Sequence, residues 1–166
     1  MRNLSKFLGI GLLAISLSAC GDKGPKDTKN PDGTTKGPGG NNSDPAKASA
    51  EAKEDFAKAV ATYKSAKADG KVSGGECDKA AGAFTKVYKT HGKQMAVAQF
   101  NAGAVWHECG DNEKAEKLYR EVMAANPKYD LPYNNLGVIY WKKGQQSKAL
   151  DMFRKGVKAN RRQAKA

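Results

Sequence analysis

Hydrophobic residues are distributed in three different ways along the chain, and each predicts a different kind of segment. Residues 7–17 form one continuous apolar run, whereas residues 20–44 show no apolar periodicity. From residue 45 onward, apolar residues recur every three or four positions, as in Phe56, Val60 and Tyr63. That is the period of a helix with one buried face. The pattern therefore predicts a leader, a linker without regular structure and an all-α domain.

Glycine-rich breaks divide the expected domain into helices. The stretches at residues 69–75 and 91–92 interrupt the helical pattern, so residues 45–95 are expected to form a pair of helices. Alternating runs typical of strands are missing, which argues against a β-sandwich or barrel.

The apolar run near the start of the chain is expected to be an export signal. It is too short to span a bilayer, and it follows Arg2 and Lys6 without an intervening acid. It leads into Leu17-Ser18-Ala19-Cys20, which resembles the signal of bacterial lipoproteins. An ordinary signal peptide is the alternative.

The resemblance to lipoproteins implies a cleaved signal at residues 1–19, a lipidated Cys20 and a membrane anchor. Residues 20–44 would then be the lipidated cysteine and a flexible Gly/Pro/Lys/Asn linker, too poor in apolar residues to fold. In two-membrane bacteria, Asp directly after the cysteine is associated with inner-membrane retention. Because Asp22 stands one place later, the resemblance implies the outer membrane, with the protein facing the periplasm.

An internal repeat with a period of 34 residues is the strongest pattern in the chain. The recurring pairs are Gly103 and Gly137, Trp106 and Tyr140, Gly110 and Gly144, Ala115 and Ala149, Tyr119 and Phe153, and Asn126 and Asn160. The pattern resembles the tetratricopeptide repeat, a helix–turn–helix unit. The resemblance implies a TPR-type α-solenoid of antiparallel helix pairs, with repeats at 96–129 and 130–163 and a degenerate pair at 45–95.

This arrangement has a consequence for the two cysteines that remain after Cys20. Cys77 opens one expected helix and Cys109 closes the next, and adjacent antiparallel helices bring such ends together. A disulfide is favoured over two buried free thiols in an oxidising compartment.

The resemblance also implies a binding face on the first helix of each repeat. Apolar pads interleaved with Asn amides suit an extended peptide from a protein partner. The expected groove contains Val97, Phe100, Asn101, Ala104, His107, Leu131, Asn134, Asn135, Val138 and Trp141. The alternative is that the Asn residues only solvate this face.

Charge and motifs add no sign of catalysis. The formal net charge is +12, and nine Lys and Arg lie between residues 142 and 166 against Asp151 alone. This basic end is a second candidate surface for an acidic partner, or simply a solvated helix face. No catalytic, metal, cofactor, nucleic-acid or small-molecule site is expected, so a non-enzymatic scaffold is favoured over a cell-wall enzyme.

Most of the chain also resembles the outer-membrane TPR lipoproteins of gliding-motility machinery. The residues concerned are the lipoprotein signal, Gly21 to Lys26, the Cys77 helix, and Asn101-Ala102-Gly103 leading to Cys109-Gly110. The resemblance implies an envelope scaffold that assembles with motility proteins. A pilotin for a type IV pilus secretin is the alternative.

The end of the sequence raises one further expectation. Residues 164–166 are where a third repeat would begin, so the chain is expected to continue into a longer array or to be capped by another chain. The alternative is a short protein with a basic tail.

Overall fold

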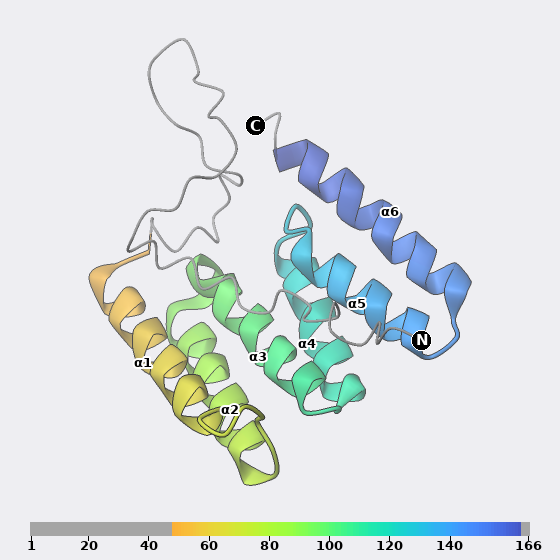
Figure 1. Ribbon diagram of the computed structural model, residues 1–166. Helices are drawn as coiled ribbons and strands as arrows, with labels where there is room; N and C mark the ends of the chain where they lie inside the picture. Colours follow the sequence, from red (N-terminus) through yellow and green to blue (C-terminus); the bar gives the residue numbers. More distant parts are fainter. Residues whose placement is uncertain (1–47, 164–166) are drawn as a thin grey trace, which may run out of the picture.

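A computed structural model describes residues 48–163, and this part of the chain is helical apart from short turns. The helices are α1 (Ala50–Ala66), α2 (Gly75–His91), α3 (Ala96–Glu108), α4 (Asn112–Ala125), α5 (Leu131–Lys142) and α6 (Gln146–Gln163), with a 3₁₀ helix η3 (Gly92–Met95) before α3. Each α-helix contacts its neighbours in sequence, so the hairpins stack in chain order from α1 to α6 (Figure 1). The expected all-α solenoid of helix pairs is confirmed.

The first helix begins later than the sequence pattern predicts. Helix α1 starts at Ala50 rather than near residue 45, because the Ser49 hydroxyl accepts a hydrogen bond from the Ala52 N–H at 3.2 Å and caps the helix there. The expected signal at residues 1–19, the lipidation site Cys20, the whole linker at residues 20–44 and residues 164–166 lie outside the described residues.

Three clusters of buried apolar residues run through the stack. The largest joins α1, α2 and α3 and includes Phe56 and Phe84, whose ring centroids are 5.8 Å apart. A second cluster links α3 and α4 to α5, and a third links α5 to α6. Because each helix pair buries its apolar face against the next, the stack is held together by contacts between neighbours.

Glycines at equivalent positions set the geometry of the last two hairpins. Gly110 and Gly144 have φ angles of 85° and 72°, which favour glycine and allow the tight turn from α3 to α4 and from α5 to α6. Gly103 and Gly137 allow close approach inside each hairpin. A Cβ atom at Gly103 would lie 2.8 Å from the Tyr119 ring, and one at Gly137 would lie 2.5 Å from the Phe153 ring.

The atoms nearest to these two helix glycines belong to the aromatic rings of Tyr119 and Phe153, one turn beyond Ala115 on α4 and Ala149 on α6.

Candidate protein-binding face

The face expected to bind a partner lies on α3 and α5, which occupy equivalent places in successive hairpins. The structure divides the ten predicted groove residues into three groups according to what each side chain contacts. Two of the groups pack within or between hairpins, and the third runs along α3 and α5.

Phe100 and Asn134, at equivalent positions, turn toward the second helix of their own hairpin. The Phe100 ring packs against Tyr119 and Tyr129, with centroids 5.6 and 5.5 Å away, and is buried. The Asn134 carboxamide oxygen lies 2.7 Å from where a Cβ atom on Gly156 would be. Both residues fill the space between paired helices, so Phe100 is a core residue and not an exposed pad.

Val97 and Leu131, also equivalent, pack backward onto the preceding hairpin. Val97 belongs to the cluster shared with α1 and α2, and Leu131 packs against the cluster that contains Tyr119 and Ile139. They join the hairpins to one another, and this differs from the open face that the sequence pattern predicts.

Six residues remain, and we call them the groove row: Asn101, Ala104 and His107 on α3, with Asn135, Val138 and Trp141 on α5. Their spacing of three residues places each set along one side of its helix. The row is more buried on α3 than on α5: Asn101 on α3 is fully buried, whereas Trp141 on α5 is 60% exposed. Peptide binding by this row stays a prediction.

Asn101 is the most unusual member of the row. Its side-chain amide is fully buried, and neither its nitrogen nor its oxygen has a hydrogen-bond partner. An unpaired buried polar group costs about 1–3 kcal/mol relative to a paired one. Such groups are rare in folded proteins, and a ligand that completes the hydrogen bonds is one physical explanation.

His107, two helical turns along the same row, has a similar deficit. Its Nε2 atom is buried without a hydrogen-bond partner. Burial, with a smaller contribution from the nearby charge of Lys142, lowers the pKa of His107 below its ordinary value of 6.5. A neutral imidazole at pH 7 can exchange hydrogen bonds with a ligand without carrying charge.

Asn135 differs from its equivalent Asn101 because part of its amide is already used. Its Nδ2 donates to the Tyr119 hydroxyl at 3.0 Å, which ties α5 to α4. Burial raises the pKa of Tyr119, so the hydroxyl stays protonated. The two Asn residues therefore have different roles: Asn101 has unused hydrogen-bonding capacity, and Asn135 fixes the packing of the two repeats.

The predicted disulfide is present and fixes the end of α3. Cys77 and Cys109 are bonded, with Cα atoms 6.3 Å apart, so the start of α2 is tied to the turn after α3. Beside it, Tyr63 donates to Glu108 at 2.7 Å, and Lys67 pairs with the same carboxylate. These contacts hold the helix that carries Asn101 and His107 against α1 and α2.

Several of these polar contacts were not predicted from the sequence. The pattern identifies Tyr63 only as a member of an apolar face, but its hydroxyl reaches Glu108 on α3. His91 lies 2.9 Å from Asp55 and joins α2 to α1. The sequence shows that Glu108 and His91 lie at the ends of expected helices. It does not identify the side chains that they contact.

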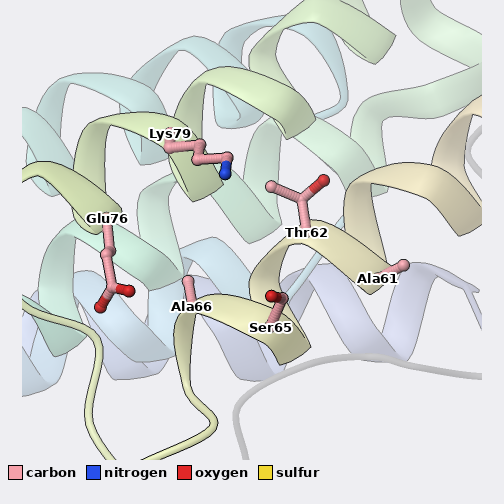
Figure 2. A pocket seen from close by; sticks show the side chains of 6 residues that line it. All are labelled: Ala61, Thr62, Ser65, Ala66, Glu76 and Lys79. Carbon is pink, nitrogen blue, oxygen red and sulfur yellow. The ribbon is translucent and has the colours of Figure 1, made fainter.

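A separate hollow of about 300 Å³ lies between α1 and α2 and contains no residue of the groove row. Figure 2 shows Thr62 and Ser65 from α1 beside it, with Glu76 and Lys79 from α2. Nothing in its lining resembles a catalytic group set.

The described residues hold neither a cluster of metal ligands nor a helix that could span a membrane. Within residues 48–163, no group of three or more His, Cys, Asp or Glu side chains is arranged to hold a metal ion. Over the same residues, none of the helices combines the length and the apolar content required to cross a bilayer.

Comparisons with known proteins agree with the helix pairing. A family model described as TPR repeat matches residues 103–144, and one described as tetratricopeptide repeat matches residues 132–163. Tetratricopeptide repeat protein 6 of Homo sapiens is 40% identical over 68 residues, which are 40% of this chain and 13% of that protein. Response regulator aspartate phosphatase E of Bacillus subtilis (strain 168) is 33% identical over 69 residues, 39% of this chain and 18% of that protein.

The matched segments therefore span less than a fifth of either relative. Tetratricopeptide repeats are generally non-enzymatic modules that bind other proteins. Residues 103–163 carry such repeats, and the described helices form a TPR-type α-solenoid.

Proposed function

We propose that the groove row binds an extended segment of a protein partner, and that Asn101 holds the backbone of that segment. The observation that carries this proposal is the unpaired amide of Asn101, whose donor and acceptor groups are fully buried and become accessible to a partner only when the residues that cover them move aside. A peptide backbone presents the complementary acceptor and donor. Ala104, one turn along, adds little side-chain bulk beside it.

The rest of the row supports the same mode of binding. His107 offers a second unused nitrogen, and Val138 and Trp141 on α5 give partly exposed apolar surface. An exposed tryptophan is a frequent anchor at interfaces, because its large rigid ring buries much area at low entropic cost.

Site-specific photocrosslinking in the native organism tests this proposal. A photoreactive amino acid at Val138 should give one adduct with a partner, while the same amino acid at the exposed Lys86 of α2 should give none. Asn101→Ala should abolish the adduct. An adduct from both positions, or one that survives Asn101→Ala, would show that the partner does not occupy the row.

We further propose that the module is anchored by lipid at Cys20 and faces the periplasm as a scaffold of a gliding-motility complex. The support is the sequence Leu17-Ser18-Ala19-Cys20, the polar linker after it and the resemblance to lipoproteins of that machinery. A pilotin for a pilus secretin is the alternative, and the identity of the crosslinked partner distinguishes the two.

The anchor has an independent test. Radiolabelled palmitate should enter the wild-type protein and not Cys20→Ala, and the variant should be released as soluble protein. Equal labelling of both forms would refute the anchor without affecting the proposal for the groove row.

A further inference from the structure

A second interaction surface lies on α6, away from the groove row. Helix α6 packs against α5 on one side, and within the described residues no helix covers its opposite side (Figure 1). That side carries Leu150, Arg154, Val157 and Arg161, spaced four, three and four residues apart and therefore in one line along the helix. We call these four residues the α6 stripe.

The stripe is exposed although half of it is apolar. Leu150 and Val157 are 49% and 54% exposed, and with Trp141 they are the large hydrophobic residues that stand out on the described surface. Arg154 and Arg161 are exposed as well, and neither takes part in an ion pair among the described residues. Lys158 lies beside them and is likewise unpaired within that range.

The preceding hairpin shows what covers the equivalent surface. Glu116, Arg120 and Met123 of α4 stand 34 residues before Leu150, Arg154 and Val157. All three contact α5: Tyr140 donates to Glu116 at 2.6 Å, Arg120 donates to the Tyr140 hydroxyl at 2.5 Å, and Met123 packs against the Leu136 cluster. The same positions on α6 therefore have the geometry for a helix that packs as α5 does on α4.

One sequence difference between α4 and α6 indicates which charge a helix packed on the stripe would carry. In α4 the Arg120 guanidinium has an acid in its own helix, because Glu116 lies 3.0 Å away. On α6 the corresponding position is Leu150, so Arg154 has lost that partner. The only acid on the described part of α6 is Asp151, which pairs with Lys155. No acid of the described part of α6 is therefore left for Arg154, and an acidic partner would supply that charge from outside the helix.

We propose that the α6 stripe binds an acidic amphipathic helix of a protein partner, whose apolar residues cover Leu150 and Val157 and whose carboxylates pair with Arg154, Lys158 and Arg161. A second copy of this chain fits poorly, because two basic stripes would repel each other. This surface is additional to the groove row and can be occupied independently of it.

Binding of a designed helical peptide to the full chain tests the inference. The probe is a helical peptide with apolar residues four positions apart on one face, as Leu136 and Tyr140 are on α5. Glutamates occupy the positions on either side of that face. A scrambled peptide of identical composition is the control. The probe should bind at least tenfold more tightly than the scrambled peptide, and its affinity should fall as salt is raised, since exposed ion pairs are screened.

Variants of exposed residues assign the site. Arg154→Glu and the double change Leu150→Ser with Val157→Ser should each weaken binding at least tenfold with the helical circular dichroism unchanged. Lys86→Glu on α2, a matched charge reversal, and Asn101→Leu in the groove row should change it less than twofold.

Several results would overturn the inference. The full chain could fail to bind the probe, the scrambled peptide could bind equally well, or Asn101→Leu could remove binding. It would also be overturned if vesicles of anionic phospholipid, and not the peptide, bound in a manner that depends on Leu150 and Arg154. If the full chain forms a dimer that dissociates in the Leu150→Ser/Val157→Ser variant, a second copy of this chain, and not a partner helix, occupies the stripe.

Discussion

Adding one methyl group at Gly103 should destabilise the protein, although alanine is a better helix former than glycine. The new Cβ atom would lie 2.8 and 3.0 Å from two carbons of the Tyr119 ring and 3.4 Å from the Leu118 Cβ. Tyr119 cannot readily move, because it is fully buried, packs against Phe100 and accepts a hydrogen bond from Asn135.

The size of the effect follows from two opposing contributions. Replacing glycine by alanine inside a helix stabilises by about 1 kcal/mol, whereas overpacking a filled core costs about 1–3 kcal/mol. Because the Tyr119 ring is held on several sides, we expect the upper end of that range and a net loss of roughly 2 kcal/mol for Gly103→Ala. For a domain of this size that lowers the Tm by roughly 5–10 °C.

Gly82→Ala is the matched control. Gly82 lies inside α2, is exposed, and has no atom within 4 Å of its added Cβ, so only the helix propensity changes. This variant should be more stable than wild type by about 1 kcal/mol. Thermal and urea unfolding followed by circular dichroism measures both variants. If Gly103→Ala proves as stable as Gly82→Ala, the close packing of α3 on α4 described above is wrong.

Three other changes test the contacts that hold the site. Reducing the Cys77–Cys109 bond, which closes a loop of 32 residues, should cost roughly 3–4 kcal/mol by the chain-entropy model; equal urea midpoints with and without reductant would contradict this. Tyr119→Phe should cost about 1–3 kcal/mol, because the buried Asn135 amide loses its acceptor, and an unchanged midpoint would argue against that bond. The pKa of His107 is lowered in the folded state, so its stabilising contribution is present above pH 6.5 and is lost as the pH falls through the pKa of the folded protein. His107→Gln should remove that part of the pH dependence of stability. An unchanged dependence of stability on pH in the variant would refute this.

The hairpins of the two C-terminal repeats could be predicted from sequence because their signal repeats. Gly110 and Gly144 mark equivalent turns, and both adopt the positive φ that only glycine takes up easily. The Cys77–Cys109 bond was predictable for a related reason: once the helices are known to be adjacent and antiparallel, their opposite ends must meet.

The direction of individual side chains was harder to predict. The sequence pattern places Phe100 and Asn134 on a binding face, but side-chain direction depends on how each helix is rotated against its partners. Phe100 is drawn between Tyr119 and Tyr129, and Asn134 fills the space that Gly156 leaves. Neither neighbour is close in sequence, so periodicity alone does not identify the contact.

The measurement that tests the central claim most directly is the effect of Asn101→Leu on stability and on partner binding in the same preparation. If the Asn101 amide is kept for a ligand, replacing it with an apolar side chain of similar volume removes an unpaired buried polar group. The free energy of unfolding should then rise by about 1–3 kcal/mol, while affinity for the segment crosslinked at Val138 should fall at least tenfold, or about 1.4 kcal/mol. A variant that loses stability, or one that binds that segment as tightly as wild type, would contradict the account.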